Sequence, residues 1–207
     1  MDRKAQHFWD WVAGMSHAPK RLGRVPRRVV ATAGRHLSRE SVVLDVGCGP
    51  GDVTVAIAAR VASLTALDPS PGMIEAARET ARRSGAGNID FVAGDLDGLV
   101  SREARFTAVT AFNVLHYIDD IPAVVRSIEA LLAPGGLFLS STACLAERTT
   151  VISGLTRLLT KLQVMPSTRF FERRELTTWI ADGGLEIVAV ERMSSLPEYF
   201  VVAKKRG

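Results

Sequence analysis

The stretch VLDVGCGPGD, from Val43 to Asp52, places three glycines within five positions directly after a short apolar run that is typical of a strand. Glycine is favoured where φ is positive or where another backbone or a ligand must come close, and ordering it is entropically unfavourable. A strand followed by a turn with so few side chains therefore predicts a loop that contacts a ligand.

Two phosphate-binding loops fit this turn poorly. A P-loop needs Gly-Lys-Ser/Thr after its glycines, and none follows Gly51. The dinucleotide pattern is G-x-G-x-x-G/A, whereas Gly47, Gly49 and Gly51 give G-x-G-x-G, with Asp52 where the third small residue should be. An acid there suits the helix dipole but repels a pyrophosphate. The turn favours a ligand without phosphates.

The turn and four later segments resemble the motifs of class I S-adenosylmethionine-dependent methyltransferases. The four segments are LTALDPS, FVAGDLD, FTAVTAFNVLHYIDD and LAPGGLFLSS, and with the turn they cover about residues 40–142 in the order of that family. A G-x-G-x-G turn alone is weak, but the acid after the second strand and the Gly-Asp after the third make the combination specific. The resemblance implies S-adenosylmethionine as cofactor and S-adenosylhomocysteine as product.

The resemblance also implies a set of cofactor-binding residues. They are Asp45, Gly47, Cys48, Gly49, Gly51, Asp68, Pro69, Met73, Gly94, Asp95, Leu96 and Asn113. Asp68 would accept hydrogen bonds from both ribose hydroxyls, since one carboxylate can accept both donors of a diol; a turn acid before Pro69 is the alternative. Asp95 would lie beside the adenine amino group and Leu96 near its ring, unless Asp95 is only a loop acid. Asp45 is expected to hold the glycine loop by accepting backbone N–H bonds.

Methyl transfer from a sulfonium requires the enzyme to align a nucleophile and exclude water, with a base only if the nucleophile binds protonated. The segment from Asn113 to Asp119 follows the fourth predicted strand, at the sheet edge where ligands of such folds collect. We expect His116 as general base, or else as a packing residue. Tyr117 would shape the pocket or cover the next helix. The resemblance puts Asn113 near the methionine part, with a turn residue as the alternative, and we assign no metal site.

The sequence after the fourth strand also narrows the substrates. Enzymes that methylate exocyclic amines of bases or glutamine amides resemble one another in an Asn/Asp-Pro-Pro-aromatic motif at this place, and NVLH has no proline. We therefore expect a small-molecule substrate and no nucleic-acid partner. Cys144 is expected to be a small apolar residue, because nothing nearby would lower the pKa of its thiol.

Short apolar runs alternate with helical patterns, which predicts an α/β fold. The predicted strands are Ser41–Val46, Ser63–Leu67, Ile89–Ala93, Phe106–Phe112 and Leu137–Thr142, followed by GLEIVAVE and EYFVVAK as an antiparallel pair at one edge. The predicted helices run from a cap at Asp52 to about Arg60, from a cap at Ser70 to before Gly85, over Pro122–Leu132 and over Arg173–Asp182. The prediction is a Rossmann-like, doubly wound seven-stranded sheet, mostly parallel, with one antiparallel strand near the C-terminus.

Length and composition indicate one globular domain: the 207 residues are 47% hydrophobic and 23% charged. We divide 1–207 into a helical cap or lid (1–40), a cofactor-binding core (41–143), a substrate-cap insertion (144–171), and a last helix with the C-terminal strand pair (172–207). No long apolar run and no signal-peptide pattern occur, and two cysteines are too few for a disulfide framework. These features favour a cytoplasmic protein, which we expect as a monomer or homodimer.

Two segments outside the core carry the signals for substrate choice. Residues 1–40 hold nine Lys/Arg against three Asp/Glu, which indicates an anionic partner or a solvated connection. Ala5–Met15 places Phe8, Trp9, Val12 and Met15 at helical spacing, and this resembles the lid of small-molecule members. Thr150–Met165 carries an apolar stripe with basic residues elsewhere. That stripe predicts a helix packed on the domain as a pocket wall, or one that rests on a membrane surface.

We therefore expect methyl transfer from S-adenosylmethionine to an oxygen, nitrogen or carbon of a small, partly apolar molecule. One alternative is a methyltransferase acting on a membrane quinone or lipid, with peripheral membrane contact. The other is an S-adenosylmethionine-binding protein that does no chemistry.

Overall fold

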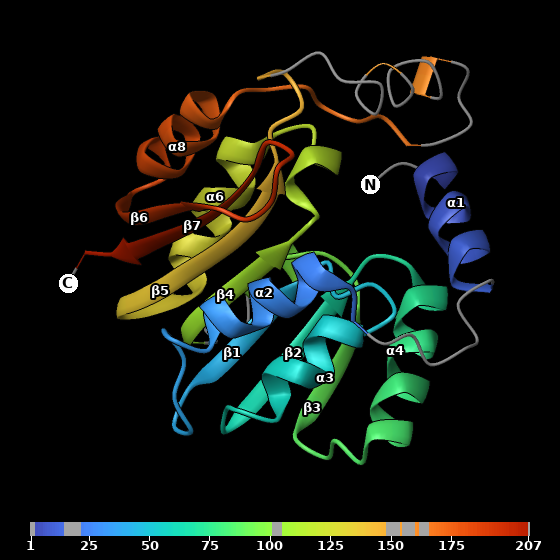
Figure 1. The fold of residues 1–207 in the computed structure, drawn as a ribbon. Coiled ribbons are helices and arrows are strands. Elements are labelled where there is room, and N and C mark those ends of the chain that lie inside the picture. Colours follow the sequence, from blue (N-terminus) through green and yellow to red (C-terminus); the bar gives the residue numbers. More distant parts are fainter. Residues whose placement is uncertain are drawn as a thin grey trace.

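A computed structural model describes residues 3–14, 22–100, 105–147, 154, 160–161 and 166–206. Within these residues, seven strands form one mixed sheet in the order β3-β2-β1-β4-β5-β7-β6 (Figure 1). The strands are β1 (Val42–Val46), β2 (Ser63–Asp68), β3 (Ile89–Ala93), β4 (Phe106–Phe112), β5 (Leu132–Ala143), β6 (Leu185–Arg192) and β7 (Glu198–Lys205). Strands β1 to β5 pair in parallel, and β7 is antiparallel to both β5 and β6. This confirms the predicted fold class.

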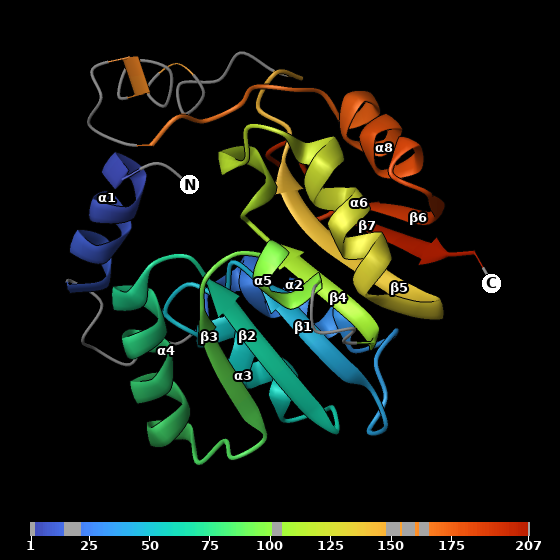
Figure 2. The same ribbon diagram turned by 180° about the vertical axis from the view of Figure 1, so that it is seen from behind.

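Helices cover both faces of the sheet. The helices are α1 (Arg3–Gly14), α2 (Arg24–Ala33), α3 (Asp52–Ala58), α4 (Pro71–Ser84), α5 (Asp97–Val100), η1 (Leu115–Tyr117), α6 (Ile121–Leu131) and α8 (Arg173–Asp182). Helices α2, α3 and α4 lie on the face shown in Figure 1, and α5, α6 and α8 lie on the face shown in Figure 2. Helix α1 lies apart from the sheet, beside the start of α4.

Neighbouring strand residues point to opposite faces, so each face has its own apolar core. Val43 and Leu139 pack with α2, α3 and α4, whereas Leu44 and Phe138 pack with α5, α6 and α8. All four side chains are fully buried. The strands therefore read as nearly continuous apolar runs, as expected for a parallel sheet that is covered on both sides.

The predicted bounds of β3, β4 and α8 agree with the structure. Strand β5 differs, because it begins at Leu132 rather than Leu137 and includes the PGG at 134–136, which lay between the predicted helix and the predicted strand. The register against β4 shifts between Phe106 and Ala108, and Gly135 has a φ of 72°. Helix α6 thus ends at Leu131, and the glycines form an irregular first part of the strand.

The starts of α3 and α4 also test the predicted caps. Ser70 accepts the N–H of Met73, and Gly85 ends α4 in the left-handed region, as predicted. The prediction that Asp52 caps α3 is wrong, because Gly51 takes the N-cap position with a φ of 86° and Asp52 is the first helical residue. An acid at that position still favours the helix dipole.

The strand order reverses between β1 and β4, so the loops after these two strands diverge and leave a crevice where ligands of such sheets bind. The glycine turn follows β1, and Asn113 follows β4. No helix among the described residues is both long and apolar enough to span a membrane. Met15 and most of the predicted stripe in 150–165 lie outside the described residues.

Candidate active site

A cavity of about 850 Å³ opens at the carboxyl ends of β1, β2, β3 and β4. Twelve of the fourteen predicted site residues line it: Asp45, Gly47, Cys48, Gly49, Asp68, Pro69, Met73, Gly94, Asp95, Leu96, Asn113 and Tyr117. Gly51 and His116 do not. The topology therefore brings together residues that are far apart in the sequence.

The three glycines of the turn serve two purposes. All have positive φ, at 71° for Gly47, 53° for Gly49 and 86° for Gly51. A Cβ on Gly47 would lie 2.5 Å from a methyl of Val114, and one on Gly51 would lie 2.9 Å from the Cα of Ala77. A Cβ on Gly49 would meet no atom within 4 Å. Gly47 and Gly51 thus permit close packing, and Gly49 presents bare backbone to the cavity.

The backbone N–H groups of the turn are already used inside the protein. Gly47 and Cys48 donate to the carbonyl of Leu67 at 2.8 and 3.1 Å, and Gly51 donates to the carbonyl of Cys48 at 3.2 Å. Gly49 donates to Asp68 at 3.0 Å. Because Pro50 has no N–H, residues 47–51 leave no N–H free to bind a phosphate, and this disfavours a dinucleotide whose pyrophosphate lies on the turn.

Asp68, at the end of β2, supports the glycine turn and faces the cavity. One carboxylate oxygen accepts the N–H of Gly49 at 3.0 Å and the other accepts the N–H of Ser70 at 2.9 Å. Burial raises the pKa of Asp68, these two bonds lower it, and the charge of Asp10 raises it further. An ionised carboxylate offers about four acceptor positions, so about two remain for donors from a ligand.

Asp45 lies deeper, and the prediction about its partners is wrong. Its donors are the hydroxyls of Thr54 and Thr110, each at 2.7 Å, rather than backbone N–H groups of the turn. Burial raises the pKa of Asp45 to about 6, against the effect of both hydroxyl bonds. Asp45 braces β1 against β4 and α3, and the carboxylate that holds the turn is Asp68.

The loops after β3 and β4 form the opposite side of the cavity. Leu96 is buried and Asp95 is exposed, with one oxygen 3.4 Å from the N–H of Gly98. Asn113 donates its N–H to the carbonyl of Ser141 at 2.8 Å. Its φ is 56°, the one positive φ outside glycine in the described part of the chain. Backbone in sparsely populated regions is concentrated at functional sites.

His116 and Tyr117 are neighbours with different surroundings. The Tyr117 ring lines the cavity and lies 5.0 Å from the ring of Trp9, edge to face. The His116 side chain is buried, and its Nδ1 has no hydrogen-bond partner. Burial lowers the pKa of His116 to about 4. Its imidazole is therefore neutral at neutral pH.

The cavity lining is acidic as well as apolar. Its charged residues are Asp45, Asp52, Asp68, Asp95, Asp97, Asp119 and Asp120, and no Lys or Arg is among the described residues that line it. Such a lining opposes an anionic ligand and favours one that carries positive charge.

Sequence reasoning missed several residues of the site. Pro26 and Val29 of α2, Val53 of α3 and Phe112 at the end of β4 add apolar surface to the cavity. The apolar face of α2 was the available signal, but only the fold places it against the glycine turn. Arg169 was missed as well: its guanidinium donates to the carbonyl of Asp119, beside the cavity.

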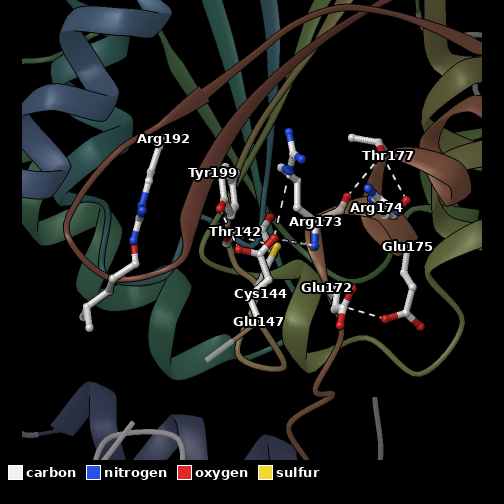
Figure 3. Close-up of polar contacts among 11 residues, drawn as sticks. Thr142, Cys144, Glu147, Glu172, Arg173, Arg174, Glu175, Thr177, Arg192 and Tyr199 are labelled. Carbon is white, nitrogen blue, oxygen red and sulfur yellow. Dashed lines mark hydrogen bonds and ion pairs between the residues drawn. The ribbon is translucent and has the colours of Figure 1, made fainter. Parts of the chain in front are cut away.

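A group of polar contacts anchors the residues after β5 (Figure 3). Glu147 accepts the hydroxyl of Tyr199 at 2.6 Å and the N–H of Arg173 at 3.1 Å. The Arg173 guanidinium lies 5.6 Å from the centroid of the Tyr199 ring. Cys144 is fully buried nearby, and burial raises its pKa to about 12. This group lies outside the cavity lining and ties the start of residues 144–171 to α8 and β7.

Comparison with known proteins adds to this geometry. Residues 43–136 match the family described as methyltransferase domain. The chain is 32% identical over 199 residues to a ubiquinone biosynthesis O-methyltransferase of Xanthomonas axonopodis pv. citri, covering 91% of this chain and 80% of the relative. A protein with the same description from Methylocella silvestris is 40% identical over 100 residues, but the match spans only 39% of its length and 48% of this chain.

A solved structure resembles the fold over nearly the whole chain. Magnesium protoporphyrin IX methyltransferase from Synechocystis, with bound S-adenosylhomocysteine, superposes with a TM-score of 0.70 at 19% identity. The superposition covers 98% of this chain and 95% of that one. At this identity the likeness concerns the fold alone.

Proposed function

This chain belongs to the class I S-adenosylmethionine-dependent methyltransferases, and on that premise we propose that its cavity binds S-adenosylmethionine beside a small, partly apolar acceptor with a phenolic hydroxyl. The observation that carries the proposal is the Asp68 carboxylate, which lines the cavity with acceptor capacity left for two donors.

The residues present fit this cofactor. The ribose hydroxyls supply the two donors that Asp68 can still accept. Gly49 gives the methionine part an unobstructed backbone, and the aspartates of the lining favour a ligand with a sulfonium and an ammonium group. Asp95 accepts a hydrogen bond from the adenine amino group, and Leu96 packs on the adenine ring. When bound, S-adenosylmethionine supplies an electrophilic methyl group.

The chain's own residues bind and orient the acceptor and exclude water from it. Trp9 and Tyr117 form an aromatic wall, and Pro26, Val29 and Phe112 add apolar surface. Such a wall suits a neutral ring better than an anion. In this proposal residues 1–40 supply the lid and residues 144–171 the substrate cap.

His116 does not act as the base in this proposal. A general base works best with a pKa near the operating pH, and the pKa of His116 is about 4. Its side chain also lies outside the cavity lining. Tyr117 is the neighbour that contacts the acceptor, through its ring.

The proposal is tested by turnover with labelled cofactor. Purified protein is incubated with methyl-labelled S-adenosylmethionine and matched panels of catechols, anilines and carbon acids, and products are identified by mass spectrometry. We expect label on the oxygen of at least one phenol. Label only on nitrogen or carbon would contradict the acceptor class, and no label on any compound or extract fraction would contradict the reaction.

A membrane quinone precursor is a second candidate. Two relatives are described as ubiquinone biosynthesis O-methyltransferases, and Trp11 on α1 is 61% exposed. Co-sedimentation with vesicles, with and without anionic lipid, tests this candidate. Binding that Trp11→Ala reduces would support it, and no binding to either vesicle would remove it.

A further inference from the structure

Asp10 joins helix α1 to the first turn of α4. One of its carboxylate oxygens accepts the Ser70 hydroxyl at 2.5 Å and the N–H of Gly72 at 3.1 Å. The Ser70 oxygen in turn accepts the N–H of Met73 at 3.0 Å. The carboxylate of one helix thus completes the capping of the next, although the two are about sixty residues apart in sequence.

The same serine connects Asp10 to the cavity. The N–H of Ser70 donates to Asp68 at 2.9 Å, and the other oxygen of Asp68 accepts the N–H of Gly49 at 3.0 Å. Asp10, Ser70, Asp68 and Gly49 therefore form one continuous hydrogen-bonded series. Apart from Asp10, its members are Asp68 at the end of β2, the N-cap Ser70 of α4, and Gly49 of the glycine turn.

The contact between α1 and α4 depends on a glycine. A Cβ on Gly72 would lie 2.9 Å from the Asp10 carboxylate oxygen, 3.2 Å from the Asp10 Cα and 3.5 Å from the Cβ of Ala13. A side chain at position 72 would therefore push the Asp10 carboxylate aside and press on the backbone of α1. In Figures 1 and 2 the last part of α1 lies against the start of α4.

Helix α1 contributes directly to the cavity in this docked position. Trp9 and Val12 are part of its lining, and Trp9 packs edge to face on Tyr117 at 5.0 Å. Trp11 is 61% exposed and is not part of the lining. One face of α1 thus lines the cavity, and Asp10 lies next to that face.

We propose that Asp10 is a positioning residue for cofactor binding: it docks α1 on α4 and, through Ser70, fixes the carboxylate of Asp68 that receives the ribose. The inference rests on the proposed function and adds a residue from α1 to it. Asp10 acts only through its neighbours.

Calorimetric titration with S-adenosylhomocysteine tests the inference, at a temperature where circular dichroism shows each variant folded. Asp10→Ala should raise the dissociation constant for S-adenosylhomocysteine at least fivefold. Gly72→Ala should do the same, because its Cβ displaces the Asp10 carboxylate from Ser70 without removing a charged group. Asp10→Asn, which keeps one acceptor oxygen, should lie between Asp10→Ala and the native chain. Trp11→Ala, on the exposed side of the same helix, should stay within twofold.

Fluorescence gives an independent readout of docking. With Trp11 and Trp179 replaced by Phe, emission reports Trp9 alone. Asp10→Ala in that background should shift the emission to longer wavelength, because Trp9 leaves its contact with Tyr117. A residue that only stabilised the fold would lower the melting temperature and leave both the emission and the low-temperature affinity unchanged.

The outcomes separate the two proposals. If the native chain binds S-adenosylhomocysteine and both Asp10→Ala and Gly72→Ala bind within twofold of it, the inference is overturned and the proposed function stands. If the native chain does not bind, the proposed function fails and the inference with it. If Asp10→Ala does not fold, Gly72→Ala decides alone.

Discussion

The backbone N–H of Arg169 donates to the carbonyl of His116 at 2.8 Å. The guanidinium of the same arginine donates to the carbonyl of Asp119 and lies 5.5 Å from the centroid of the Trp179 ring. One residue near the end of 144–171 thus binds the chain on both sides of Tyr117. This loop forms one wall of the cavity.

Replacing Arg169 should therefore impair acceptor use more than cofactor binding. Arg169→Ala is expected to lower kcat/KM for the acceptor about fivefold to tenfold, because the loop of Tyr117 loses the guanidinium bond to Asp119 and keeps only the backbone bond to His116. The S-adenosylhomocysteine affinity should change less than twofold. Arg78→Ala is the matched control, since Arg78 also donates to a carbonyl, that of Phe91, and lies 5.9 Å from an aromatic centroid. Equal effects of the two substitutions on kcat/KM would refute the assignment.

Asp68 should dominate cofactor affinity. Asp68→Ala is expected to weaken S-adenosylhomocysteine binding at least tenfold, on the order of 1.4 kcal/mol, because the ribose loses its acceptor and Gly49 loses its partner. Calorimetry measures the affinity, and Asp90→Ala, an exposed acid on β3 outside the cavity lining, is the control. Unchanged affinity in Asp68→Ala would mean that the ribose lies elsewhere.

The glycine turn allows a test in which backbone strain is matched. Gly49 and Gly85 both have positive φ, at 53° and 71°, and a Cβ on either would meet no atom within 4 Å. Alanine at each position should lower stability by about 1–2 kcal/mol. Only Gly49→Ala should weaken S-adenosylhomocysteine binding, by at least fivefold. The account fails here if the two variants bind equally.

His116 should influence stability at acidic pH. Its pKa is lowered from 6.5 to about 4 in the folded state, so between these values the unfolded chain binds the extra proton. The free energy of unfolding should therefore fall by up to about 3 kcal/mol as the pH falls from about 6.5 to about 4. Denaturant unfolding of His116→Phe, compared with the native chain at pH 7 and pH 4.5, measures this contribution.

Asp45 changes the free energy of unfolding with pH in the opposite direction, so its contribution must be separated from that of His116. Its pKa is raised from 3.8 to about 6, so its contribution to stability decreases as pH rises through that window. The His116→Phe variant should retain the pH-dependent contribution of Asp45 and lack that of the imidazole. If the native chain and His116→Phe lose the same stability between pH 7 and pH 4.5, the buried neutral imidazole is contradicted. Turnover should show no inflection near pH 6.5 in either protein.

Much of the sheet and of the cavity lining could be predicted because both depend on local signals. Strand β4 and helix α8 follow from apolar runs and helical spacing, and the Ser70 cap follows from a serine before a proline. The acid that ends β2 and the glycine turn after β1 meet because parallel strands bring their carboxyl ends to one edge.

The remaining errors come from interactions between distant residues. The partners of Asp45 are threonines on α3 and β4, one of them 65 positions away, and no local pattern identifies them. The PGG within β5 is an ordinary turn signal, but residues on both sides of it pair with β4, Leu132 with Phe106 and Leu137 with Ala108. The contact of Asp10 with Ser70 depends on where α1 docks, which sequence periodicity does not specify.

A crystal structure with S-adenosylhomocysteine tests the central claim most directly. The account predicts that both ribose hydroxyls donate to the Asp68 carboxylate, with the amino-acid part against Gly49 and the adenine beside Leu96. A nucleoside whose sugar hydroxyls bind away from Asp68, or density for a pyrophosphate against the glycine turn, would contradict it.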